Sequence, residues 1–109
     1  MIINSEIRLK KGIVTGTLIK LQNKSLIIIN SKNGYLMCEY LDINIANRQG
    51  DIAGKVTGIE NFEEALNARI VELSMAAKEL GIKTGITGRN YLNTIMKNLK
   101  DIKKVRNHI

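Results

Sequence analysis

Cys38 carries the most reactive side chain of this protein and is its only cysteine among 109 residues. A thiol acts as a nucleophile when its pKa is depressed and a base lies beside it. The single histidine, His108, stands at the far end of the chain, so a Cys–His pair is not expected. Cys38 follows Met37 in a segment predicted as a strand, where cysteine is often an inert core residue. A buried structural cysteine and a thiol facing a cleft therefore stay as two open interpretations.

Three carboxylates, Glu39, Asp42 and Glu60, stand near the ends of predicted strands. Two of them could form a carboxylate pair across the sheet, although spacing alone does not establish one. In the other interpretation Asp42 caps a helix and the glutamates face solvent. If the protein is an enzyme, we expect Cys38 as the reactive group, Asp42 as the base or orienting group, and Arg89 as the clamp for the substrate.

Residues 84–89 contain the parts of an anion-binding site. Two glycines allow a tight turn, the helix predicted to follow presents free N–H groups, and Arg89 adds a cation with bidentate geometry. The pattern lacks the full spacing of a phosphate-binding loop. A plain helix start, with Arg89 paired to a protein carboxylate such as Asp42, is the alternative. The expected ligand-binding residues are Gly85, Thr87, Gly88 and Arg89.

A helix-turn-helix would use the same region to bind DNA. Residues 77–82, followed by a basic helix, have a small residue and a glycine four positions apart, as this motif requires. The register then fails, because Thr87 stands where the second helix should bury an aliphatic side chain and Gly88 would lie inside that helix. No strand carries the aromatic residues of a single-strand platform. A nucleic-acid-associated basic protein is therefore a disfavoured alternative.

The formal net charge of +7 at pH 7 raises anionic partners as a possibility. Much of it is concentrated in a basic C-terminal tail, which is either solvated surface or the contact for an anionic partner. One cysteine and one histidine are too few for a zinc site or an internal disulfide, and no cofactor is expected. The cations of this tail are Lys97, Lys100, Lys103, Lys104 and Arg106.

The composition, 44% hydrophobic and 25% charged, is that of an ordinary globular protein. Residues 1–6 lack a basic stretch leading into a long apolar run, so no signal peptide is expected. No segment approaches the ~18 consecutive apolar residues of a membrane span. We therefore expect a cytoplasmic protein with a single domain over residues 1–109, large enough to fold without disulfides or metals.

The N-terminal half is predicted to form the β-strands. Apolar residues alternate between Glu6 and Leu21, interrupted at residues 10–12, which predicts a strand, a turn and a second strand. Residues 25–30 are apolar without alternation, as in a strand covered on both faces. Asn33-Gly34 predicts a hairpin turn because both residues tolerate positive φ, and residues 35–40 form the return strand.

The second half is predicted to be mainly helical. A short helix occupies residues 41–50 with Asp42 near its cap, a glycine-bearing strand follows over residues 52–59, and a long helix spans about 61–80. A further helix begins near Thr87 and turns an apolar stripe to the sheet. This order indicates an α+β fold: an antiparallel or mixed sheet from the N-terminal half, with the short helix and two longer helices packed on it.

The chain resembles the YunC-like family, the bacterial and archaeal domain of unknown function 1805. The resemblance is carried by residues 33–42, by the strand through Gly54 and Gly58 into the next helix, and by residues 80–82 leading to Gly88-Arg89. It implies a small α+β domain with no established activity, whose N-terminal β region, here residues 1–40, forms a tetramer. The family usually has a glycine after the cysteine and an acidic residue after Gly-Arg, where this chain has Glu39 and Asn90.

Self-association is also expected from the strands themselves. Two aliphatic hairpins leave open sheet edges that a monomer would have to protect, and pairing with a second copy satisfies them. The sequence therefore predicts a homo-oligomer, with a small anion held between the Cys38 strand and the start of the Thr87 helix.

Overall fold

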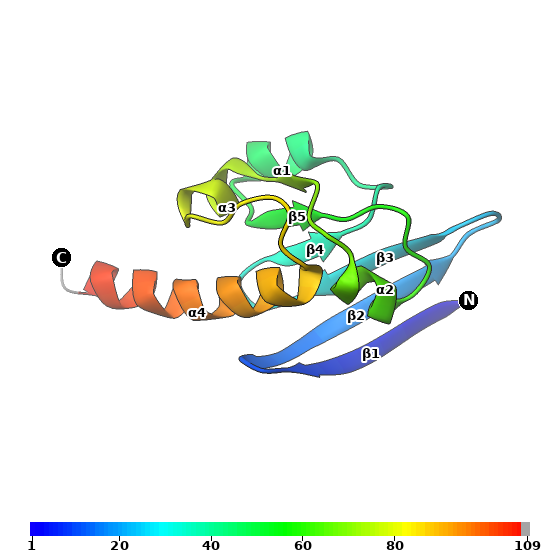
Figure 1. Ribbon diagram of the computed structural model, residues 1–109, viewed down its shortest axis with the longest axis horizontal. Helices are drawn as coiled ribbons and strands as arrows, with labels where there is room; N and C mark the ends of the chain where they lie inside the picture. The colour runs from blue at the N-terminus through cyan, green and yellow to red at the C-terminus, as the bar shows by residue number, and fades with distance from the viewer. Residues whose placement is uncertain (108–109) are drawn as a thin grey trace.

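Six strands form one mixed sheet in a computed structural model that describes the backbone of residues 1–107 and the side chains of residues 1–97. The strands follow the order β1-β2-β3-β4-β5-β6, and all neighbours are antiparallel except the parallel pair β4–β5 (Figure 1). The predicted α+β class with a mixed sheet is confirmed. The strands are β1 (Ile2–Leu9), β2 (Gly12–Lys20), β3 (Ser25–Asn30), β4 (Tyr35–Met37), β5 (Ala53–Lys55) and β6 (Glu72–Leu73).

Four helices cover parts of this sheet: α1 (Ile43–Gln49), α2 (Phe62–Asn67), α3 (Met75–Glu79) and α4 (Gly88–Asn107). Figure 1 shows that α4 begins beside the sheet, with α2 near its first turn, and then extends past the end of the sheet. The predicted basic tail at residues 100–109, including His108, lies outside the residues whose side chains the structure describes.

The β1–β2 and β2–β3 hairpins follow the predicted alternation. One face of these strands lies in the core. The side chains there include Val14, Leu18, Ile27 and Ile29, which are at most 8% exposed. The prediction that the β3 segment is covered on both faces is only partly right. The outer side chains of Leu26 and Ile28 are only partly buried: Leu26 packs against the main core cluster, and neither belongs to the cluster formed with α1.

The β3–β4 hairpin forms where Asn33-Gly34 predicted it, but for a different reason. Neither residue has a positive φ. A Cβ on Gly34 would lie 2.6 Å from the carbonyl oxygen of Ile52, so glycine is needed for close approach of two backbones. The hydroxyl and N–H of Ser31 both donate to the carbonyl of Gly34 at 2.8 Å and close the turn.

Helix α1 joins the two parallel strands and has the predicted caps. The Asp42 side chain accepts a hydrogen bond from the N–H of Asn44 at 2.9 Å, and Gly50 ends the helix at φ +75°. Ile43 and Ala46 pack on the outer face of β4 and β5 with Met37 and Ala53.

The predicted strand over residues 52–59 is short in the structure, because only β5, Ala53–Lys55, pairs with its neighbours. Gly54 lies in this strand beneath α4. A Cβ there would be 3.1 Å from both the Tyr91 ring and the Ile70 side chain. The absence of a side chain at Gly54 therefore leaves room for the side chains of Tyr91 and Ile70, not for a second backbone.

The long helix predicted over residues 61–80 is wrong. The chain leaves the helical conformation at Ala68, whose ψ is 153°. Ile70 then exchanges hydrogen bonds with the backbone around residue 86, and the N–H of Val71 donates to the carbonyl of Lys55 at 2.9 Å. Strand β6 therefore interrupts the helix, because the edge of β5 offers its backbone partners.

Helix α4 confirms the predicted C-terminal helix. Tyr91, Leu92 and Ile95 are all 0% exposed and pack with the inner side chains of β2, β3 and β4. Buried residues of α2, Ala65 and Leu66, belong to the same cluster. Strands β4 and β5 thus have helices on both faces, whereas β1 to β3 have them on one face only.

Candidate functional site

Cys38 lies one residue beyond β4 and is 1% exposed, so the strand predicted over residues 35–40 ends earlier than expected. Its N–H donates to the carbonyl of Ile27 at 3.1 Å, and its Sγ accepts a hydrogen bond from the N–H of Ile27 at 3.3 Å. The thiol belongs to the main core cluster. A nucleophilic role would therefore require the core to open beside β3.

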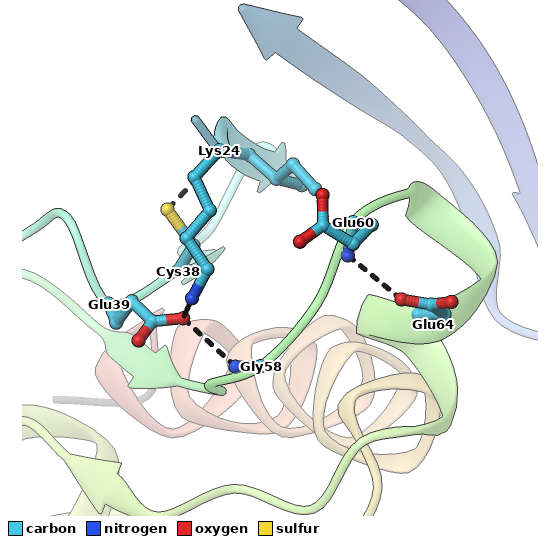
Figure 2. Close-up of polar contacts among 7 residues, drawn as sticks. Lys24, Cys38, Glu39, Gly58, Glu60 and Glu64 are labelled. Carbon is cyan, nitrogen blue, oxygen red and sulfur yellow. Dashed lines mark hydrogen bonds and ion pairs between the residues drawn. The ribbon is translucent and has the colours of Figure 1, made fainter. Parts of the chain in front are cut away.

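Glu39 projects from the same corner toward two donors from distant elements. Its Oε1 accepts a hydrogen bond from the N–H of Gly58 at 2.9 Å and forms an ion pair with Lys24 (Figure 2). The hydrogen bond from Lys24, together with that from Gly58, holds the pKa of Glu39 below its ordinary value. The bond to Glu39 in turn raises the pKa of Lys24. Glu39 therefore bridges the β2–β3 turn and the segment after β5.

Sequence reasoning did not identify Lys24 as the partner of Glu39, although the hairpin register contains the signal. Ile28 pairs with Met37, so the residues before Ile28 run back alongside those after Met37. Counting outward from this pair places position 26 opposite position 39, with position 24 two residues further along the same strand direction. The carboxylate pair considered for Glu39 and Glu60 is replaced by this ion pair and by a separate contact: the N–H of Glu60 donates to Glu64 at 2.9 Å.

Asp42 follows the turn closed by the hydrogen bond from Leu41 N–H to the carbonyl of Cys38, at 3.2 Å. Its carboxylate accepts from the N–H of Asn44 and serves α1 as the N-cap. The capping interpretation of Asp42 is therefore confirmed. Its use as a base or orienting group stays a prediction.

The first turn of α4 finds protein partners for several of its amides. The N–H of Gly88 donates to the carbonyl of Ala68 at 2.9 Å, and the N–H of Asn90 donates to the hydroxyl of Thr87 at 3.2 Å. A Cβ on Gly88 would lie 2.4 Å from the carbonyl oxygen of Ala65, so this turn is pressed against α2. Fewer N–H groups point to solvent than a free helix start would offer.

Gly85 and Arg89 flank this turn. Gly85 has φ +94°, and its carbonyl accepts from the guanidinium of Arg69 at 2.7 Å. Arg89 pairs with Glu63 of α2 at 3.1 Å, not with Asp42, the acid suggested from sequence. Both side chains are accessible, at 39% for Arg89 and 71% for Glu63. Exposed ion pairs of this kind contribute little to stability, so a ligand anion can compete for Arg89.

The fold brings the two predicted halves of the site to the same strand. Gly88 lies over β4, and its ideal Cβ would be 2.8 Å from Leu36 Cδ2, two residues before Cys38. The hydrogen bonds of the two side chains nevertheless go elsewhere: Cys38 to Ile27, and Arg89 to Glu63. The Cys38 thiol is in the core, while the Arg89 guanidinium is at the surface.

A hollow at the other end of β4 was not identified from sequence. The Tyr35 hydroxyl donates to Asp51 at 2.7 Å. Burial, the larger cause, and this hydrogen bond, the second cause, raise the pKa of Tyr35 to about 12. The Tyr91 hydroxyl donates to the Tyr35 carbonyl at 3.0 Å. The hollow has a volume of about 430 Å³ and is lined by residues 30–35 and 50–52.

No helix in the part of the chain that the structure describes is long and apolar enough to cross a membrane. Among the same residues, no group of three or more potential metal-binding side chains lies together.

The family described as "Domain of unknown function (DUF1805)" matches residues 37–95, more than half of the chain. The chain belongs to this family. The predicted YunC-like membership is thus confirmed. The chain is also similar to a protein described as uncharacterized protein YunC of Bacillus subtilis (strain 168): the two are 32% identical over 87 residues, which cover 76% of this chain and 86% of that protein.

The DUF1805 fold also has a solved relative. The crystal structure of a protein of unknown function, TA1206 from Thermoplasma acidophilum, matches with a TM-score of 0.83 and 32% sequence identity. The match covers 87% of this chain and 93% of that one. The match therefore includes most of the sheet and its helices.

Proposed function

We propose that this DUF1805 domain is a homo-oligomeric assembly unit whose N-terminal β region, residues 1–40, contacts further copies of the chain. The observation that supports this is the uncovered outer face of β1 to β3. The face turns away from α2 and α4 and carries the aliphatic side chains of Ile2, Ile13, Ile19, Leu26 and Ile28.

Strand register gathers three of these side chains into one row. Ile2 pairs with Ile19, and Ile19 pairs with Leu26, so the three lie side by side across β1, β2 and β3. Ile2 is 64% exposed and Ile13 is 54% exposed. The rest of the face is mostly polar, because Thr17 pairs with Asn4, Thr15 pairs with Glu6, and Ile13 pairs with Arg8. An exposed aliphatic row of this kind is typical of protein–protein contacts, because its burial removes apolar area from water.

The edge of β1 adds a second reason for self-association. β1 is eight residues long, stands at the end of the strand order and pairs with β2 on one side. Its free edge presents backbone N–H and C=O groups that a strand from another copy can satisfy. Face and edge belong to the same three strands, so one assembly can cover both. A tetramer is the form we propose.

A matched pair of double variants tests the outer face. Ile2→Glu with Ile13→Glu places two charges on it, whereas Val71→Glu with Met75→Glu places two charges on comparably exposed side chains elsewhere, at 50% and 63% exposure. We expect sedimentation of the wild type to give a multiple of 12.2 kDa, and of the first variant a 12.2 kDa species. The Val71 and Met75 variant should retain the wild-type mass.

A monomeric wild type at low micromolar concentration contradicts the proposal. If the wild type and the Ile2 and Ile13 variant had the same oligomeric mass, the interface would not lie on the outer face.

A small anion held by Gly85, Thr87, Gly88 and Arg89 is the second function we propose. Its support is the accessible Arg89–Glu63 pair, in which a ligand carboxylate or phosphate can take the place of Glu63. Cys38 as a reactive thiol is the enzymatic version of this proposal, and its burial makes binding the favoured form. We expect no cofactor.

Removing each partner of the Arg89–Glu63 pair should move anion affinity in opposite directions. Arg89→Ala should abolish thermal stabilisation by phosphate, nucleotides or small carboxylates, whereas Glu63→Ala should strengthen it by removing the competing carboxylate. Arg48→Ala, at an exposed arginine on α1, is the control and should leave the shift unchanged. Equal shifts in the Arg89 variant and the wild type would remove this site from consideration.

A further inference from the structure

The excess positive charge of the chain lies in two stretches of its sequence. Residues 8–11 and 97–109 together contain eight of the 17 basic residues but only one of the ten acidic residues. The rest of the chain has nine residues of each sign. The net charge of +7 therefore belongs to these two stretches. We call Lys10, Lys11 and Lys97, whose side chains the structure describes, the basic end.

The fold brings the two parts of the basic end together. The N–H of Lys11 in the β1–β2 turn donates to Oδ1 of Asn93 on α4 at 2.9 Å, across 82 residues of sequence. An ideal Cβ on Gly12 would lie 3.2 Å from the sulfur of Met96, the residue before Lys97. Figure 1 shows α4 passing the β1–β2 turn and continuing toward the C-terminus. Sequence alone did not connect these lysines.

The cations of the basic end are available to a ligand. All three are exposed, and none belongs to the ion pairs found among the described residues, which use Lys24, Lys55 and Arg89. The acid nearest to Lys10 along the preceding strand is Glu6, four residues away. Exposed cations can approach phosphates without the cost of breaking an internal pair.

We infer that the basic end binds the phosphate backbone of a nucleic acid duplex without recognition of base sequence. Lys10 and Lys11 of the β1–β2 turn and Lys97 of α4 are the described cations that would contact the phosphates. Contacts of this kind release counterions and give affinity that falls steeply with salt.

The aromatic residues favour a duplex over other polyanionic partners. The four of them, Tyr35, Tyr40, Phe62 and Tyr91, all lie outside the basic end and outside residues 98–109. Stacking on single-stranded bases requires aromatic side chains, and helices on bilayer surfaces often insert them. Duplex phosphates require only positioned cations.

Charge-neutralising variants of the full chain test the inference. Binding of a labelled duplex of about 20 base pairs is followed by fluorescence anisotropy over a series of salt concentrations. We expect Lys10→Gln with Lys11→Gln to weaken binding at low salt at least about tenfold, and to flatten the slope of log affinity against log salt by about 1.8. Lys32→Gln with Lys78→Gln removes the same charge from exposed positions elsewhere and should change both quantities much less.

Three outcomes would overturn the inference. They are absence of duplex binding by the wild type at about 50 mM salt, equal losses in the two double variants, and tighter binding to phosphatidylserine vesicles than to the duplex at the same salt. Neither substitution removes the backbone N–H of Lys11, so the contact with Asn93 should persist. Unchanged thermal melts will verify that both variants fold.

Discussion

Tyr35 joins three parts of the domain through polar contacts. Its hydroxyl donates to Asp51 after α1, while its carbonyl accepts from the buried hydroxyl of Tyr91 on α4. Burial is the first cause of its raised pKa, and the bond to Asp51 is the second. The native structure therefore favours the neutral form of the Tyr35 side chain.

The raised pKa of Tyr35 makes stability depend on alkaline pH. Because the folded pKa of about 12 exceeds the ordinary value of 10.0, the folded state holds this proton more tightly. The contribution is fully present below pH 10 and is lost as the pH rises toward 12. Urea unfolding across this window should show a steeper loss for wild type than for Tyr35→Phe, which has no proton to release.

The phenylalanine variant also controls for other groups that titrate at alkaline pH, including Tyr91, whose pKa burial also raises. Parallel pH dependence in the two proteins would exclude Tyr35 as the source. Asp51→Asn should lower the pKa of Tyr35 but leave it above 10.0, since burial persists.

The interruption of the predicted helix at residues 68–74 determines how β6 and α3 are arranged. Ser74 ends this segment and is 0% exposed. Its hydroxyl accepts from the N–H of Ala53 at 3.0 Å and from the N–H of Ala77 at 3.3 Å. One side chain therefore satisfies a donor of β5 and caps α3, which fixes β6 and α3 against the sheet.

Ser74→Ala should lower the free energy of unfolding by about 1–3 kcal/mol, because it leaves a buried N–H of β5 without a partner and removes the cap of α3. Urea unfolding followed by circular dichroism measures the change. Ser5→Ala, at a hydroxyl with one long contact of 3.4 Å on the sheet surface, should stay within about 0.5 kcal/mol. Similar values for the two variants would show that Ser74 does not hold these elements.

The whole molecule has unequal cover on its sheet. Strands β4 and β5 lie between α1 on one face and α2 with α4 on the other, so their side chains are buried on both faces. Strands β1 to β3 have an outer face with an aliphatic row that no helix of the described chain covers. The proposed assembly would give these strands the second layer that β4 and β5 already have.

Assembly through this face should make thermal stability depend on protein concentration. If only the folded chain associates, mass action raises the Tm as the concentration rises over about a hundredfold range. The Ile2 and Ile13 variant should lose this dependence, whereas the Val71 and Met75 variant should keep it. A constant Tm for the wild type would contradict an association linked to folding.

Several features of the domain follow from sequence alone. The alternation of β1 and β2, the Asp42 and Gly50 caps of α1 and the apolar stripe of α4 depend on neighbours within a few residues, so local patterns identify them. The α+β class and the DUF1805 membership were recognised on the same basis. Cys38, Asp42 and the Gly85 to Arg89 segment were proposed for chemical reasons, and their functional roles stay predictions.

Only the tertiary structure decided which distant segments pair with each other. Leu66, Ile70, Leu73 and Ala77 enter the core whether their segment is one helix or two helices and a strand, so their spacing does not distinguish the two. The hydrogen bonds offered by β5 and by residues 85–86 decide the outcome. The same holds for the partner of Arg89 and for the contact between Lys11 and Asn93. These pairings depend on how the elements pack, which no local pattern encodes.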